Sequence, residues 1–306
     1  LDDDPTFIVI NKNKNLIENM LSVKLDITLM DNDALRKKLI DNSKLSKSKF
    51  DIISFDMPWT GEIHKNKYFL PLNDVINKIN FNIKDFHPAG IKASTYNNIL
   101  YGLPVEEVAS IMVYRKDIFD YLELNIPNNL TDLFFCLKKL KKFSPTDYPF
   151  AWPATTGFPL GCHFIEMLGN LGSPLVELRK ISEGIFDTTN LDSVPKKINI
   201  VNENAINSVF LLSKLKKYSH PQILSMTWDR VADSYAKGEV AMANIWSGRS
   251  GYFENNPSSP AHKNSVYRAK PGGIEGFEAS SIGGFSLGLP SNINKNKIKI
   301  IFSVIK

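Results

Sequence analysis

The segment TWDRVADSYAKGEVAMANIW, residues 227–246, joins a helix pattern to a strand pattern through a glycine. Its first half carries apolar side chains at the spacing i, i+3, i+4, i+7 of one helix face. These residues are Trp228, Val231, Ala232 and Tyr235. Gly238 predicts the end of this helix, because glycine readily adopts the left-handed conformation that closes a helix.

A continuous apolar run follows at residues 240–246 and ends on Trp246. A continuous pattern, unlike an alternating one, indicates a strand that is covered on both faces. Open α/β sheets bind their ligands beyond the carboxyl ends of such strands. From these residues alone, Trp246 fits a core position and a ligand contact equally well.

Helix and strand patterns elsewhere in the chain also favour an α/β fold. We expect strands at residues 7–10 and 25–30, and helices at residues 34–40, 116–122, 131–143, 162–171 and 203–217. The helix at 34–40 follows three good capping residues, Asp31, Asn32 and Asp33. Residues 255–276 are rich in Pro, Ser, Gly and Lys without periodicity, which predicts a loop.

Length and composition indicate a globular protein of about two domains. The chain has 306 residues, more than one hydrophobic core usually organises. Hydrophobic residues make up 43% of the chain, as expected for a globular protein. No run of eighteen apolar residues is present, so we expect no membrane span.

The net charge of +5 raises the question of a nucleic-acid partner. The lysines are scattered, the dense patches at residues 44–49 and 138–142 are short, and no nucleic-acid motif accompanies them. The lysines of the second patch lie opposite an apolar helix face, so we interpret them as a solvated face and expect no nucleic-acid partner.

The sequence offers little support for catalysis or for a cofactor. The five histidines are isolated without zinc-ligand spacing, so no metal site and no cofactor is predicted. Cys136 fits a helix core and Cys162 a loop, and a disulfide between them stays open. Asp56 and Glu106 could form the carboxylate pair of a glycosidase, an alternative that we keep behind a non-enzymatic function.

Short segments in order along residues 50–290 resemble motifs of the family 1 extracellular solute-binding proteins, the sugar-binding components of bacterial ABC importers. Besides the segment at 227–246, they are FDIISFDMPWTGE (50–62), FLPLND (69–74), YGLPVEE (101–107), IMVYRKDIF (111–119), LTDL (130–133) and IGGFSLGLP (282–290). Each motif is weak by itself, and their order and spacing make the resemblance specific.

The resemblance implies a two-lobed α/β fold, the type II fold of periplasmic binding proteins, with the ligand cleft between the lobes. Lobe one would comprise residues 1–108 plus 281–306 and lobe two residues 109–280, with hinge crossings near 105–110 and 279–282. The final helices of the family would be missing and no secretory signal is visible, so we expect a fragment or a processed chain.

The resemblance also implies the function. We expect a non-catalytic, monomeric receptor in the periplasm or at the extracellular face of the membrane. It would capture a monosaccharide or oligosaccharide and deliver it to the permease subunits of an ABC transporter. The alternative is a binding protein for another small solute, namely a polyol phosphate, a polyamine or a peptide.

The candidate site residues are those that suit a pyranose, which has an apolar C–H face and a rim of hydroxyls. Stacking rings are expected from Trp59, Trp152 and Trp246, whereas Trp228 is interpreted as supporting core. Hydroxyl acceptors are expected from Asp56, Glu106 and Glu107. Asp56 could instead cap a turn, and one of the two glutamates is expected to face water.

The remaining candidates are Arg249, Gly283, Gly284 and Phe285. The guanidinium of Arg249 could bind a hydroxyl, although a position on the rim is the favoured interpretation. The glycine pair with Phe285 would let backbone amides approach a ligand, or would form a plain strand bulge.

Overall fold

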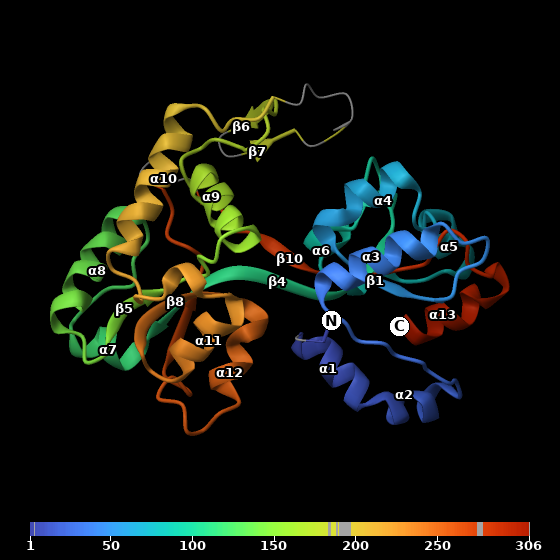
Figure 1. The fold of residues 1–306 in the computed structure, drawn as a ribbon, viewed down its shortest axis with the longest axis horizontal. Coiled ribbons are helices and arrows are strands. Elements are labelled where there is room, and N and C mark those ends of the chain that lie inside the picture. The colour runs from blue at the N-terminus through green and yellow to red at the C-terminus, as the bar shows by residue number, and fades with distance from the viewer. Residues whose placement is uncertain (3, 183–184, 188, 190–196, 274–277, 306) are drawn as a thin grey trace. The chain divides into compact units, whose positions relative to one another are not determined.

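The computed structural model describes residues 1–2, 4–182, 185–187, 189, 197–273 and 278–305. The chain divides into two compact units (Figure 1). Unit 1 is Leu1–Val108 with Ile282–Lys306, and unit 2 is Ala109–Ser281. The chain passes from one unit to the other inside β4 (Gly102–Arg115) and returns immediately before β10 (Ile282–Gly288).

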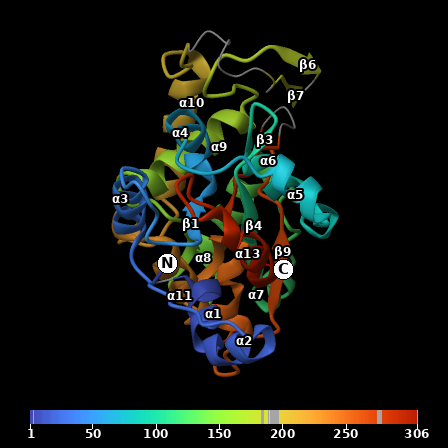
Figure 2. The ribbon, with the colours of Figure 1, turned by 90° about the vertical axis from the view of Figure 1, so that its right-hand side faces the viewer.

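Unit 1 is built around β1 (Ile53–Asp56), which pairs antiparallel with β10 so that Asp56 lies opposite Phe285. Figure 2 shows α3 and α5 on opposite sides of β1. Its helices are α1 (Pro5–Lys12), α2 (Lys14–Leu21), α3 (Asn32–Ser43), α4 (Thr60–Asn66), α5 (Asn73–Ile79), α6 (Pro88–Ala93) and α13 (Ile298–Ile305). A small hairpin joins β2 (Thr95–Tyr96) to β3 (Ile99–Leu100).

Unit 2 has a sheet in which β4 pairs antiparallel with both β8 (Val240–Trp246) and β9 (Ser265–Arg268). Strand β8 also pairs in parallel with β5 (Tyr148–Ala151). The helices are α7 (Lys116–Tyr121), α8 (Leu130–Phe143), α9 (Phe158–Asn170), α10 (Glu203–Lys216), α11 (Trp228–Ala236) and α12 (Gly251–Glu254). A separate hairpin pairs β6 (Lys180–Ser182) with β7 (Ile185–Phe186).

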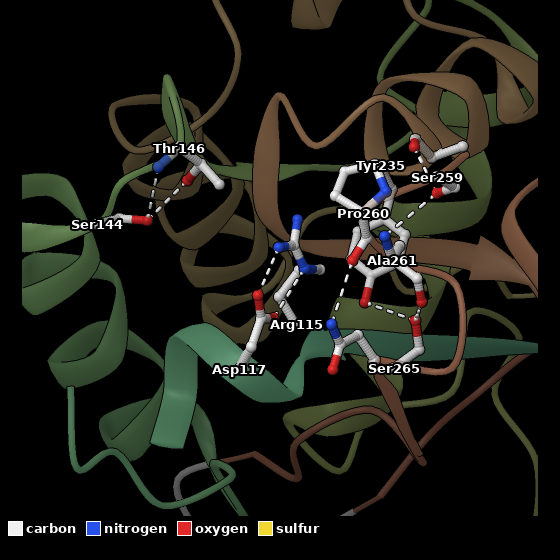
Figure 3. Close-up of polar contacts among 11 residues, drawn as sticks. Arg115, Asp117, Ser144, Thr146, Tyr235, Ser259, Pro260, Ala261 and Ser265 are labelled. Carbon is white, nitrogen blue, oxygen red and sulfur yellow. Dashed lines mark hydrogen bonds and ion pairs between the residues drawn. The ribbon is translucent and has the colours of Figure 1, made fainter. Parts of the chain in front are cut away.

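The predicted helix, glycine and strand are confirmed as α11, Gly238 and β8. Gly238 has a φ of +79°, and a Cβ there would lie 2.7 Å from Cγ of Pro260. The loop that carries Pro260 is held to the end of α11, because the Tyr235 hydroxyl donates to Ser265 Oγ at 3.1 Å (Figure 3). The close approach of this loop therefore requires glycine at the corner.

The predicted helices at 34–40, 116–122, 131–143, 162–171 and 203–217 are confirmed as α3, α7, α8, α9 and α10. The strand predicted at 7–10 is wrong, because these residues belong to α1. Asp4 caps that helix by accepting a hydrogen bond from the Thr6 N–H at 2.9 Å, and Pro5 occupies its first turn.

Three further expectations need correction. Residues 25–30 form no strand, and the Leu25 N–H donates instead to the Glu18 carboxylate at 2.8 Å. The loop predicted at 255–276 contains the strand β9. Residues 274–276 of that loop lie outside the described part of the chain. Cys162 lies in α9 and not in a loop, and both Cys136 and Cys162 are free thiols.

Candidate functional site

Asp56 stands at the carboxyl end of β1, where the chain turns into a short 3-10 helix, Met57–Trp59. Asn32, at the start of α3, donates from Nδ2 to its carboxylate at 3.5 Å. Burial raises the pKa of the Asp56 carboxyl to about 6, although the bonds from Asn32 and the Met57 N–H act in the opposite direction. The two hydrogen bonds therefore do not offset the free-energy cost of removing the carboxylate from water.

In the sequence, Asn32 stands within a cluster of capping residues and gives no local sign of a further role. Its Oδ1 is buried without a hydrogen-bond partner among the described residues. Asp31 is the actual cap of α3 and accepts from the Ala34 N–H at 2.8 Å. The side chain of Asn32 therefore does not cap the helix. It lies beside Asp56, and its Oδ1 can still accept a hydrogen bond.

Trp59 follows Asp56 by three residues and is partly buried. Its ring packs against the unit 1 core that includes Phe55, Ile63 and Phe69. One part of the indole therefore fixes its position while another part remains open to solvent, as a stacking surface requires.

Glu106 and Glu107 are neighbours on β4 and differ in burial. Glu106 is buried, whereas Glu107 is exposed. The Glu107 side chain lies directly over Gly90 of α6, where an added Cβ would fall 1.6 Å from its Oε1. Successive strand residues point to opposite faces, so the two carboxylates do not converge on one ligand.

The glycine pair in β10 lies against the backbone of β4. Gly284 has a φ of +126°, and a Cβ there would lie 2.0 Å from the carbonyl oxygen of Glu106. Phe285 is buried and packs edge-on against Phe7, with ring centroids 5.6 Å apart. Close packing of two backbones accounts for Gly284 without a ligand, and Gly283 is partly buried beside it.

In unit 2, Trp246 ends β8 opposite Ser110 of β4 and is partly buried. Arg249 is buried, and its Nε donates to Asp229 Oδ1 at 3.1 Å. The guanidinium of Arg249 is therefore already bound to a carboxylate of α11. Trp228 is also partly buried and packs edge-on against Phe158, at 5.9 Å between ring centroids.

Trp152 follows β5 and is only 3% exposed. Its indole Nε1 donates to Ser219 Oγ at 2.9 Å, and its ring meets His163 edge-on at 5.1 Å. It lines a cavity of about 50 Å³, large enough for a few water molecules. The polar residues in the same wall are His163, Glu166, Asn170, Asn244 and Lys270.

A buried charged cluster in this wall was not predicted from the sequence. The Glu166 carboxylate receives a hydrogen bond from Lys270, lies 3.2 Å from His163 Nδ1, and accepts from the Ser281 N–H at 2.9 Å. Burial acts to raise the pKa of Glu166, but His163 and Lys270 together hold it well below its usual value. Burial also lowers the pKa of His163 to about 4, so its ring is neutral at pH 7.

The spacing of His163 and Glu166, three residues apart on one helix, was the only local sign of this cluster. Lys270 is 104 residues from Glu166 in the sequence, so no local pattern could reveal it. Within the described ranges, no three His, Cys, Asp or Glu side chains form a group that could hold a metal ion. No helix in those ranges is both long and apolar enough to span a bilayer.

Comparisons with known proteins agree with this architecture. The family profile described as "Bacterial extracellular solute-binding protein" matches residues 23–297. A ribitol complex of an ABC transporter solute-binding protein from Agrobacterium radiobacter superposes with a TM-score of 0.83 at 20% identity, covering 99% of this chain and 73% of that one.

Two other solved structures are also similar. Maltose-bound MalE3 of T. maritima gives a TM-score of 0.81 at 18% identity, with 99% of this chain and 74% of that chain covered. A protein from Thermotoga lettingae with bound α-D-tagatose gives 0.76 at 20% identity, with 98% and 72% covered. The mixed α/β fold is thus that of periplasmic binding proteins, and the chain belongs to the family of bacterial extracellular solute-binding proteins.

Proposed function

We propose that this protein is the non-catalytic, monomeric substrate-binding component of an ABC importer and that its solute is a carbohydrate. The two units would act as lobes that close on a monosaccharide or oligosaccharide and present it to the permease. Closure shifts a population only if the ligand binds the closed form more tightly than the open one. The chain crossings near residues 105–110 and 279–282 would serve as the hinges.

The observation that carries the proposal is the pair formed by Asp56 and Asn32, with Trp59 three residues after Asp56 in the chain. A carboxylate deprived of water and an amide oxygen without a partner are together suited to hydrogen bonds with ligand groups. A sugar hydroxyl can donate to Asp56 and an indole can stack on the sugar's C–H face. The solved relatives carry ribitol, maltose or tagatose, ligands that share such hydroxyl groups.

In unit 2, we propose that Trp246 supplies a second stacking ring, since its indole is only partly buried at a strand end. Trp152 would contribute through the wall of its cavity, and Arg249 by holding Asp229 in place. Glu106, Glu107, Gly283, Gly284 and Phe285 would shape the strands around the unit 1 contacts.

Tryptophan fluorescence and thermal shift against a panel of monosaccharides and disaccharides test the proposal. We expect at least one sugar to move both signals, and we expect Asp56→Asn and Trp246→Ala to weaken its binding about 10-fold or more. Trp228→Phe serves as the matched aromatic control and should bind as the wild type does.

Three results would contradict the proposal. No response to any sugar, together with a response to a polyamine, a peptide or a phosphate ester, would reassign the solute. Binding unaffected by Trp246→Ala would remove that residue from the site. Sustained release of reducing sugar from an oligosaccharide, lost in Asp56→Asn, would mean that the protein is a glycoside-cleaving enzyme.

A further inference from the structure

Helices α8 and α10 of unit 2 bring many lysines together at their carboxyl ends. We call this set the lysine surface: Lys138, Lys139, Lys141, Lys142, Lys214, Lys216 and Lys217. The carboxyl ends of the two helices lie next to each other (Figure 1). Lys141 of α8 donates from Nζ to the carbonyl of Lys217, which directly follows α10, at 3.0 Å. Lys214 Nζ likewise lies 4.2 Å from the centroid of the Phe134 ring.

The charge of the lysine surface is not neutralised by the protein. Among the residues that the structure describes, no carboxylate forms an ion pair with any of these lysines. Lysines elsewhere on the protein do have such partners, as Lys116 pairs with Asp120 and Lys237 with Asp233. A helix dipole favours cations in the last turn, but it does not account for Lys138 and Lys139 further back.

The surface also forms an open groove that an anionic group could enter. The groove measures about 460 Å³ and is lined by Lys138, Lys141, Lys142, Lys217 and Tyr218. Ammonium groups crowded around one hollow repel each other, and this repulsion is relieved when a bound anion lies among them.

Large aromatic side chains alternate with these lysines on the exposed face of α8. Phe135 is 56% exposed and Phe143 is 49% exposed. Lys139 lies between them at the i+4 helical spacing, and its Nζ is 5.8 Å from the centroid of each ring. On α10, Phe210 is 65% exposed one turn before Lys214. Exposed aromatic rings among lysines are characteristic of surfaces that bind at the interface of a bilayer.

We propose that the lysine surface binds a membrane that contains anionic phospholipid. The ammonium groups would contact lipid phosphates, while Phe135, Phe143 and Phe210 would enter the boundary between headgroups and acyl chains. This contact lies outside the solute site and goes beyond solute binding. The proposal commits to a lipid, because a bilayer offers phosphate charge together with an apolar layer that the exposed rings can enter. A nucleic acid, whose bases could also stack on these rings, is an outcome of the test.

Co-sedimentation of the full chain with vesicles tests this proposal. We expect binding to vesicles of equal parts phosphatidylglycerol and phosphatidylcholine, and little binding to pure phosphatidylcholine. The variant Lys138→Gln, Lys139→Gln, Lys142→Gln should bind about 100-fold more weakly, at roughly 5-fold for each lysine. Glutamine preserves the helix propensity of α8.

The matched control removes the same charge from exposed lysines of unit 1, as Lys38→Gln, Lys47→Gln, Lys65→Gln. It should retain binding within a few-fold. Phe135→Ser with Phe143→Ser should abolish the part of the binding that persists at high salt, since screening removes only the electrostatic part.

Several results would overturn the proposal. The first is that the wild type does not sediment with anionic vesicles. The second is that the lysine variant and the unit 1 control lose the same amount of vesicle binding. The third is that the lysine variant and the unit 1 control both bind vesicles as the wild type does. Binding of duplex DNA or polyglutamate with the same lysine dependence, without binding of vesicles, would assign the surface to a nucleic acid or to an acidic protein.

Discussion

Glu166 in unit 2 and Asp56 in unit 1 are both carboxylates withdrawn from water, yet their surroundings differ. Glu166 is contacted by Lys270, His163 and a backbone N–H, and its pKa is held low. Asp56 has Asn32 as its side-chain neighbour, and burial raises its pKa to about 6. The difference separates a charge whose partners lie within the fold from one that its neighbours compensate only in part.

The first test removes the cationic partner of Glu166. Lys270→Met should destabilise unit 2 by about 3–5 kcal/mol, because it leaves a buried carboxylate without its cation. The free energy of unfolding in urea measures this loss.

A double substitution separates the loss of charge from the loss of packing. Glu166→Gln with Lys270→Met should recover most of the stability, because no unpaired charge is then buried. Lys237→Ala, which breaks an exposed ion pair with Asp233, is the control and should have a much smaller effect. A small effect of Lys270→Met alone would contradict the structural interpretation of Glu166.

The second test uses pH, because the two regions should respond in opposite directions. His163 resists protonation when folded, so unit 2 should lose stability as pH falls from 6.5 toward about 4. Asp56 resists ionisation when folded, so unit 1 should gain stability as pH falls from about 6 toward 3.8. The Asp56 contribution is about 3 kcal/mol at most.

Hydrogen-exchange protection factors of peptides from each unit can follow these changes separately. His163→Gln should remove much of the acid sensitivity of unit 2, and Asp56→Asn should flatten the response of unit 1. If protection in both units shifted in the same direction and by equal amounts, the contrast between the two regions would be lost.

The third test sharpens the interpretation of Asp56 as a ligand group. At neutral pH, Asp56→Asn should stabilise the folded protein by about 1–2 kcal/mol, because a neutral amide costs less to bury than a charge. The same change should weaken ligand binding. Thermal unfolding and a sugar titration on one sample measure both effects, and a stabilised variant with unchanged affinity would show that Asp56 has no part in binding.

The smallest expected effect concerns the hydrogen bond of Trp152. Ser219→Ala should cost about 0.5–1.5 kcal/mol, because the indole N–H loses its acceptor. Ser213→Ala, at an exposed position of α10, is the control and should change stability by less. Equal losses in the two variants, measured in urea, would contradict a structural role for the Trp152 bond.

Local patterns predicted the parts of the fold that local physics decides. The segment at 227–246 contains its own helix face, its glycine and its strand, and all three are found in the structure. The strand expected at 7–10 was wrong because Ile8, Val9 and Ile10 look like a strand while Asp4 and Pro5 start a helix. Packing of Phe7 against Phe285 is a tertiary contact that the sequence does not reveal.

The candidate site was predictable to a similar degree. The positions of Asp56 and Trp59 just after a strand could be predicted, because that strand is recognisable in the sequence, and the structure adds Asn32 beside Asp56. The burial and ion pair of Arg249 were not predicted, because Asp229 is twenty residues away on a different element. Contacts between distant segments, such as Lys270 with Glu166, depend on the completed fold.

The burial of Trp152 gives the protein an internal optical reference. A collisional quencher such as iodide needs solvent access, and Trp152 is 3% exposed whereas Trp59, Trp228 and Trp246 are partly open. The emission that survives quenching should therefore come mainly from Trp152. A bound solute that covers Trp59 or Trp246 would then appear as lost quenching against a constant background.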